Sequence, residues 1–330
     1  MTKQLGHLDA RIPNWNLDDL HNRDCPICSF KKHTQRYIRP DGLSVRHCET
    51  CDTYFVSPSP SEGQLRSFYS KYDEMHRRAP RISDAERSTT LQKPAHIIND
   101  FRIQEILSMM DLKGKICLDV GFGRGNFLEY FQLLGADARG VEVDPKAIIY
   151  AKEHLGIKSV TEGTIFDLEN TTKFDVIIMN DLIEHPLEPS KLIEKATSLL
   201  SSEGILAFFT PNASFINEED QPIAFRVDLE HMQYFTFATC SFLSKRYGLE
   251  IVHLESLGFP YLEGIDELPH RDFSHVSFRN KLKKTISSLP GFETANNIRH
   301  LLKRSSNEKV ERMGHYHLFC IFRHKKEQIE

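Results

Sequence analysis

The chain has 330 residues, of which 40% are hydrophobic and 27% charged, and these proportions are ordinary for a globular protein. This content of Leu, Ile, Val and Phe excludes general disorder, and no apolar run approaches the roughly 18 residues of a transmembrane helix. Acidic residues outnumber basic ones by 46 to 42, so the net charge of −4 gives no general attraction to nucleic acid. Residues 1–15 lack the apolar segment of a secretory signal, which predicts a cytoplasmic protein.

Four of the seven cysteines form two C-x-x-C pairs near the start of the chain, at Cys25, Cys28, Cys48 and Cys51. Two such pairs can bring four thiolates to the corners of a tetrahedron, the arrangement of structural Zn²⁺, and their separation lies within the range of zinc ribbons. A closed site of four thiolates leaves no position for a substrate, so the metal is expected to organise the fold. The alternative is a pair of disulfides, which would suit a secreted protein.

Short apolar strands alternate with helical patterns from about residue 91 onward. Such alternation predicts βαβ crossovers and a mostly parallel sheet with helices on both faces. Ligands of these sheets bind at the carboxyl ends of the strands. In chain order, we expect a strand at 115–122, a helix at 126–134, a strand at 137–144, a helix from Pro145, strands at 158–164 and 174–180, a helix at 190–200, and strands at 204–210, 249–255 and 316–322.

A glycine loop follows the first of these strands, in the segment L-D-V-G-F-G-R-G at 118–125. Asn126 stands where a dinucleotide fingerprint would have its last glycine, and no G-K-[ST] follows, so neither a dinucleotide nor a P-loop nucleotide fits. Asp119 places a carboxylate beside the loop, which disfavours a pyrophosphate and suits a ligand with a cationic amino-acid end.

Four segments in order resemble class I S-adenosylmethionine-dependent methyltransferases: the glycine loop, V-E-V-D-P, F-D-V-I-I-M-N-D-L-I-E-H and S-S-E-G-I-L-A-F-F-T-P-N. The resemblance covers roughly residues 91–255. It implies an α/β fold, a Rossmann-like seven-stranded sheet that is mostly parallel with an antiparallel last strand, and S-adenosylmethionine as cofactor. The cofactor-binding residues that it implies are Asp119, Gly121, Phe122, Gly123, Gly125, Glu142, Val143, Phe166, Asp167 and Asn180.

The resemblance also assigns parts of the cofactor to particular residues. The glycine loop with Asp119 would line the methionine and ribose, Glu142 would accept from both ribose hydroxyls, and Asn180 would face the methyl-bearing sulfonium. Asp167 would accept from the adenine amino group, with a helix N-cap as the alternative role for this residue. The glycines themselves have the alternative of forming nothing more than a turn.

Methyl transfer needs a base only where the acceptor is a hydroxyl or a carbon acid. Two histidines are placed to serve, each following a glutamate: His185 after the fourth strand, and His231 in the segment after the fifth. The predicted catalytic residues are His231, Glu230 and His185, and a structural or pocket-shaping role is the alternative for His185.

The cysteine box followed by Y-F-V-S-P-x-P-S resembles bacterial enzymes that carry a zinc module ahead of a methyltransferase domain. The better-understood members C-methylate nucleotide-linked keto-sugars and carry a Y-H-E-H run. Glu230 and His231 match its last two positions, whereas Asp228 and Leu229 replace the Tyr and the first His. The resemblance implies a small polar acceptor, such as a sugar, nucleotide-sugar or glycan-derived metabolite, that is O- or C-methylated. Tyr69 and Tyr72 would either reach over the pocket or pack at a domain seam.

We expect four regions: a zinc ribbon at 1–62, a helical linker or cap at 63–112, the methyltransferase core at 113–256, and a basic helical insertion with the last strand at 257–330. The segment 271–312 contains ten basic and four acidic residues, and the spacing of its apolar residues predicts two amphipathic helices. These would form a lid, a partner-binding arm, a surface for an anionic membrane or phosphorylated substrate, or a solvated hairpin.

Two other functions remain open from the sequence. An RNA methyltransferase would use the ribbon to hold its substrate, but the acidic net charge and the absence of an N-P-P-F/Y run after the fourth strand argue against nucleic acid. A non-catalytic member would bind S-adenosylmethionine as a sensor or scaffold. The oligomeric state is left open.

Overall fold

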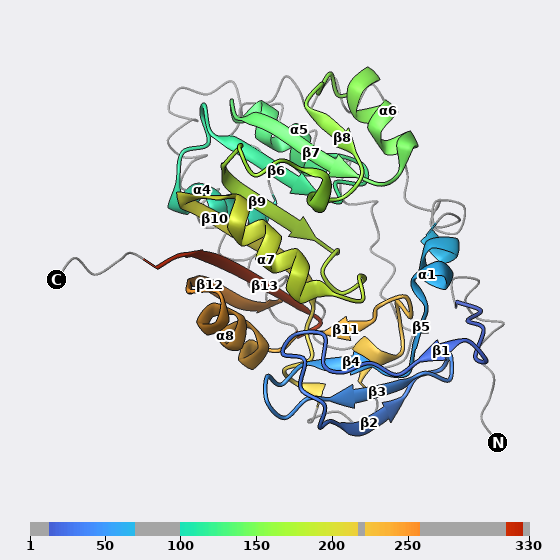
Figure 1. The fold of residues 1–330 in the computed structure, drawn as a ribbon. Coiled ribbons are helices and arrows are strands. Elements are labelled where there is room, and N and C mark those ends of the chain that lie inside the picture. Colours follow the sequence, from blue (N-terminus) through green and yellow to red (C-terminus); the bar gives the residue numbers. More distant parts are fainter. Residues whose placement is uncertain (1–12, 70–99, 217–221, 258–314, 326–330) are drawn as a thin grey trace, which may run out of the picture. The chain divides into compact units, whose positions relative to one another are not determined.

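The computed structural model describes residues 13–69, 100–216, 222–257 and 315–325 (Figure 1). Tyr72 and the predicted basic helices of 271–312 lie outside these residues. The chain divides into two compact units, one of residues 1–255 with 318–330 and one of residues 256–317. Within the described ranges, no helix has the length and apolar character needed to cross a membrane.

A seven-stranded sheet forms the centre of the first unit, in the order β12-β13-β10-β9-β6-β7-β8 (Figure 1). The β6–β7, β7–β8, β6–β9 and β9–β10 pairs are all parallel, and the last strand runs antiparallel. The predicted Rossmann-like methyltransferase sheet is therefore confirmed. Its strands are β6 (Ile116–Val120), β7 (Asp137–Glu142), β8 (Val160–Glu162), β9 (Phe174–Asn180), β10 (Leu200–Pro211), β12 (Leu249–Leu257) and β13 (His317–His324).

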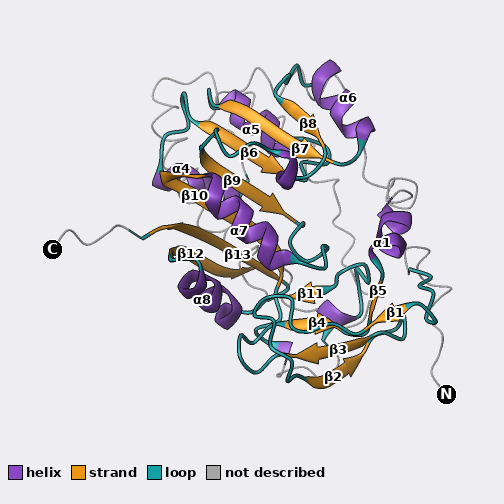
Figure 2. Cartoon of the chain, in the orientation of Figure 1, coloured by secondary structure: helices purple, strands orange, loops and turns teal. Residues whose placement is uncertain are grey.

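Helices connect the parallel strands (Figure 2). Local capping starts several of them, since Asp144 accepts from the backbone N–H of Lys146 at the start of α6, and Thr236 forms a capping box with Thr239 in α8. The helices are α1 (Glu62–Tyr69), α4 (Phe101–Met109), α5 (Asn126–Leu133), α6 (Pro145–Glu153), α7 (Pro189–Leu199) and α8 (Phe237–Arg246), with 3₁₀ turns at Ile165–Asp167 and Ile223–Phe225.

Six of the seven strands have other ends than the sequence predicted, and only the strand at 174–180 matches at both ends. The strand expected at 115–122 ends at Val120, because Gly121 adopts a φ of 68°, and Phe122 lies in the following turn. The strand expected at 158–164 ends at Glu162, before Gly163 with a φ of 136°. The strand expected at 204–210 begins earlier, at Leu200, and its register against β9 shifts between Leu200 and Ile205.

The N-terminal region forms a small four-stranded antiparallel sheet in the order β11-β4-β3-β2. Three of its strands come from the ribbon: β2 (Thr34–Ile38), β3 (Ser44–His47) and β4 (Tyr54–Val56). The fourth, β11 (Gln233–Tyr234), comes from the methyltransferase core and pairs with β4. A two-stranded sheet joins β1 (Leu20–His21) to β5 (Ser59–Pro60). The region predicted as a zinc ribbon thus shares a sheet with a strand of the predicted core.

The apolar core is continuous between these two sheets. One buried cluster contains Ile27 and Phe55 of the ribbon together with Phe208 of β10 and Leu243 of α8. Burial of apolar side chains is the main favourable contribution to folding. The ribbon and the methyltransferase sheet therefore stabilise each other, in accord with the single compact unit that holds both.

Candidate active site

The glycine loop after β6 has a backbone that only glycine adopts without strain. Gly121, Gly123 and Gly125 have φ values of 68°, 49° and 76°. At Gly123, a methyl group added in place of the hydrogen would meet no atom within 4 Å, so the space beside this residue is open. The loop combines a tight turn with an open face, which is what a close approach of a ligand to backbone requires.

Glu142 ends β7 directly beside this loop. Its Oε2 accepts from the backbone N–H of Gly123 at 2.9 Å, and its Oε1 accepts from the N–H groups of Val143 and Asp144 at 2.7 and 3.1 Å. These bonds hold the carboxylate in one orientation. Oε1 uses both of its lone pairs in these bonds, whereas Oε2 keeps one, so the group can still accept from a hydroxyl of a ligand.

Asp119 lies in β6 beneath the loop and is only 3% exposed. Burial raises the pKa of its carboxyl to about 8, the nearby Glu142 carboxylate adds to the rise, and the Arg102 guanidinium opposes it. A cationic group of a ligand placed here would favour the ionised form and lower this pKa.

This raised pKa predicts a dependence of stability on pH. The unfolded carboxyl loses its proton near its ordinary pKa of 3.8 and the folded one near 8, so between these values the native state binds more protons and stability falls as the pH rises. Relative to Asp119→Asn, the ligand-free wild type should lose stability by up to about 1.4 kcal/mol per pH unit in this window. Urea unfolding of both proteins from pH 5 to pH 9 measures the difference, and a constant difference would contradict the assignment.

Two large apolar side chains are exposed at the same edge of the sheet. Val143, just after β7, is 61% exposed, and Phe166, in the 3₁₀ turn after β8, is 54% exposed. Neighbouring Asp167 accepts from the backbone N–H and hydroxyl of Thr164 at 2.8 and 2.9 Å, and these bonds lower its pKa. Asp167 is therefore the N3 residue of a capping box whose N-cap is Thr164, which differs from the N-cap role that the sequence analysis gave as its alternative. Its role toward adenine stays a prediction.

Asn180, at the end of β9, holds a buried side-chain nitrogen, Nδ2, with no hydrogen-bond partner in the described part of the chain. Its Oδ1 lies 3.5 Å from Nη1 of Arg102 in α4. Leaving a buried donor unpaired is costly, so an orphaned N–H group beside the glycine loop is an observation that fits a polar ligand.

Arg102 was missed by the sequence analysis, which treated its helix as a linker. Its guanidinium lies over the rings of Phe127 and Phe209 at 4.7 and 4.9 Å and pairs with Asp100 at 2.8 Å. It lowers the pKa of Asp119 and so lies close enough to bring a positive charge to the site. No motif surrounds Arg102, and only the packing of α4 against the sheet places it here.

Glu184, His185, His231 and Tyr69 meet after the ends of β9 and β10. The His185 and His231 rings lie 4.9 Å apart, and the Tyr69 hydroxyl is 2.7 Å from Nδ1 of His185. Glu184 is fully buried, and its Oε1 lies 3.9 Å from Nε2 of each histidine. The two predicted histidines therefore share one location, Tyr69 joins them by a hydrogen bond, and Glu184 was missed.

Asp181 connects the cofactor side to this cluster. Burial and the Asp228 carboxylate raise the pKa of Asp181 to about 6, and the Arg102 guanidinium opposes them. Asp181 and Asp228 both have positive φ values, 47° and 48°, which are rare outside glycine and concentrate at functional sites. Burial raises the pKa of Glu184, and the carboxylates of Asp181 and of the buried Glu230 add to the rise.

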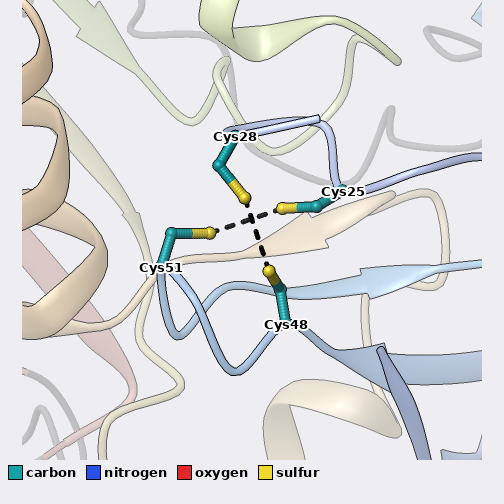
Figure 3. A group of neighbouring side chains, drawn as sticks. All are labelled: Cys25, Cys28, Cys48 and Cys51. Atoms are coloured by element: carbon teal, nitrogen blue, oxygen red, sulfur yellow. Dashed lines mark hydrogen bonds between the residues drawn. The ribbon is translucent and has the colours of Figure 1, made fainter. Parts of the chain in front are cut away.

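The four ribbon cysteines converge on one point, as Figure 3 shows. The Sγ atoms of Cys25 and Cys51 are 3.4 Å apart and those of Cys28 and Cys48 are 3.5 Å apart, and all four atoms lie within 4.8 Å of one another. These separations exceed a disulfide bond of about 2.05 Å, and all seven cysteines are free thiols. The donor set and its spacing fit a tetrahedral zinc ion.

Arg39 of the ribbon connects this region to the segment that carries His231. Its guanidinium donates to the backbone carbonyls of Leu229 and His231 and to the Tyr234 hydroxyl, and it pairs with Asp41. Only 2% of Arg39 is exposed. Since β11 also pairs with β4, two independent sets of contacts hold the segment 229–234, which we call the acceptor segment, against the ribbon.

The glycine loop, Glu142 and Asn180 lie at the carboxyl ends of adjacent parallel strands, where open α/β sheets bind their ligands. Residues 94–254 match the family model described as a methyltransferase domain. The chain thus contains a class I S-adenosylmethionine-dependent methyltransferase domain.

Curated relatives share this domain at modest identity. A protein named ubiquinone biosynthesis O-methyltransferase from Coxiella burnetii is 34% identical over 128 residues, which cover 37% of this chain and 55% of that protein. The protein of the same name from Xanthomonas oryzae is 30% identical over 160 residues, covering 46% of this chain and 64% of the relative. The chain thus spans only about half to two thirds of the length of these relatives.

Solved structures with related folds are more distant. A 1,6-didemethyltoxoflavin-N1-methyltransferase from Burkholderia thailandensis, with bound S-adenosylhomocysteine, is 14% identical with a TM-score of 0.47, and covers 89% of this chain and 100% of its own. A SAM-dependent methyltransferase from Archaeoglobus fulgidus is 17% identical with a TM-score of 0.46, and covers 77% and 98%.

Proposed function

We propose that the protein transfers the methyl group of S-adenosylmethionine to a small polar acceptor. One observation supports it above the others: the open glycine loop, the fixed Glu142 carboxylate and the exposed Val143 and Phe166 follow three neighbouring strands in order. Amino-acid, ribose and adenine parts of the cofactor would lie along this edge. When bound, S-adenosylmethionine supplies a methyl carbon already activated by the sulfonium.

The chain's own residues would bind and orient that cofactor. Asn180 would donate a hydrogen bond from its unpaired Nδ2 to an oxygen of the cofactor. The Arg102 guanidinium would pair with the carboxylate of the cofactor's amino-acid part. Asp119 would face the ammonium group. Val143 and Phe166 would flank the adenine ring, which would remove their exposed apolar surface from water.

The acceptor would lie beside His185 and His231, which we propose as the residues that activate it. Glu230, buried next to His231, belongs to the same segment. A sugar, nucleotide-sugar or glycan-derived acceptor is supported by the cysteine box and by Glu230-His231. The names of the curated relatives favour a hydroxyl as the methylated group, since both are named O-methyltransferases.

We further propose that the four ribbon cysteines hold a structural zinc ion, and that the ribbon completes the acceptor side of the domain. The alternative function of the ribbon, RNA binding, has less support, because two of the ribbon's basic residues make contacts within the protein. Arg39 is buried against the acceptor segment, and Arg46 donates to the Ser57 carbonyl. A cytoplasmic location remains a prediction.

Calorimetric titration with S-adenosylmethionine, S-adenosylhomocysteine and NAD tests the cofactor. We expect the first two to bind and NAD not to bind. Glu142→Ala should weaken binding by about 1–3 kcal/mol, because a charged hydrogen-bond acceptor is lost. Glu162→Ala, at the exposed end of the next strand, is the matched control and should bind normally. Equal affinity of the Glu142 variant and the wild type would defeat the site assignment.

A further inference from the structure

Three potential ligand atoms converge on the acceptor side of the site. They are Oε1 of Glu184 and the Nε2 atoms of His185 and His231, and the group lies within 4.8 Å. Glu184 is fully buried, yet its Oε1 has no hydrogen-bond partner among the described residues. Its other oxygen accepts from the Thr210 hydroxyl at 2.9 Å.

An unpartnered carboxylate oxygen in the interior requires an explanation, since burying a charge without compensation is costly. Each histidine Nε2 is 3.9 Å from this oxygen, which is too far for a hydrogen bond. A divalent cation about 2.1 Å from each atom would fit within this separation.

Hydrogen bonds orient two members of the cluster, His185 and Glu184, as those of a metal site would. The Tyr69 hydroxyl is bonded to Nδ1 of His185, which turns the opposite ring nitrogen toward Glu184. Thr210 fixes the other oxygen of the carboxylate. Such outer contacts set the tautomer and the orientation of metal ligands. The side chains of His185 and His231 remain 15% and 8% exposed, so the cluster is reachable from outside.

We propose that Glu184, His185 and His231 bind one divalent transition-metal cation, with its remaining positions open to an oxygen of the methyl acceptor. Two imidazoles and one carboxylate are a ligand set that Zn²⁺, Mn²⁺ and Fe²⁺ accept. The acceptor is then a hydroxyl compound, and preferably one with a second oxygen able to chelate the cation.

This inference rests on the proposed function. It makes the two histidines metal ligands and not bases, because a ring nitrogen that binds a cation cannot also take a proton. The cation lowers the pKa of the bound hydroxyl, whose proton passes to water. The oxygen then forms a bond to the methyl carbon as the carbon–sulfur bond breaks. The electron pair of that bond goes to sulfur, which leaves as neutral S-adenosylhomocysteine.

The test titrates Mn²⁺ into the full-length protein with its ribbon zinc in place, and the electron paramagnetic resonance signal of free Mn²⁺ reports binding. We expect one Mn²⁺ per chain. Glu184→Gln keeps the shape of the side chain and should weaken binding by more than about tenfold, and Tyr69→Phe, which removes one hydroxyl, by about tenfold. His253→Gln is the control, because His253 also lies beside two carboxylates, Glu105 and Glu255, outside the cluster.

Absence of Mn²⁺ binding by the wild type would overturn the proposal, as would unchanged binding in a folded Glu184→Gln or in Tyr69→Phe. Calorimetry with S-adenosylmethionine on the same samples separates the two hypotheses. Cofactor binding without Mn²⁺ binding would refute the cation site and leave the proposed function standing. Mn²⁺ binding without cofactor binding would refute the proposed function and leave the cation site standing.

Discussion

Exchanging Arg39 for Ala is expected to destabilise the protein by about 3–5 kcal/mol, the usual cost of removing one partner of a buried ion pair. The change would leave Asp41 buried without its cation and two backbone carbonyls of the acceptor segment without donors. The acceptor segment should then shift, and His231 with it. Methyl transfer should fall more strongly than cofactor binding, because the residues of the glycine loop do not contact Arg39.

The measurements are urea unfolding, calorimetry with S-adenosylmethionine, and turnover once an acceptor is known. Arg46→Ala is the matched control, since this arginine lies in the neighbouring strand and donates to a carbonyl of the ribbon itself. Arg39→Lys should restore little of the lost stability and turnover, because an ammonium group cannot reproduce the planar guanidinium that donates to several acceptors at once. A stable Arg39→Ala protein with normal turnover would show that the acceptor segment does not depend on this contact.

The second large effect is expected from loss of the ribbon metal. Cys48→Ser should remove one zinc ion per chain relative to the wild type, and the ribbon should unfold, because structural zinc contributes about 10–16 kcal/mol of binding free energy in small domains. A typical domain has only about 5–15 kcal/mol of stability in total. Since β4 of the ribbon pairs with β11, the acceptor segment should lose its order as well.

Elemental analysis measures the zinc content, circular dichroism measures the loss of folded structure, and a turnover assay measures the loss of activity. Cys117→Ser is the control, because Cys117 is also a fully buried thiol but lies in β6, away from the ribbon. That variant should keep its zinc. A folded Cys48→Ser protein that retains the same zinc content as the wild type would refute the tetrathiolate site.

The sequence alone was sufficient for the features that depend on local patterns. Alternating apolar strands and helices predicted a mostly parallel sheet, the resemblance implied its seven-stranded form, and the two C-x-x-C pairs predicted which cysteines converge. The glycine loop and Glu142 were predicted from motifs, because a strand-to-helix turn and the residue that ends the next strand have recognisable chemistry within a few positions. The strand ends were less accurate, since backbone conformations at Gly121 and Gly163 decide where pairing stops.

The tertiary structure decided the contacts between residues far apart in the chain. Arg39 meets the His231 carbonyl across 192 residues, and Tyr69 meets His185 across 116. Neither pair has a periodicity or a spacing that a sequence displays, because such contacts depend on the register of β11 against β4 and on the packing of α1. The same holds for Arg102 and Glu184, which look like ordinary helix and loop residues. The packing of the fold makes them a half-buried cation and a buried carboxylate beside the proposed site.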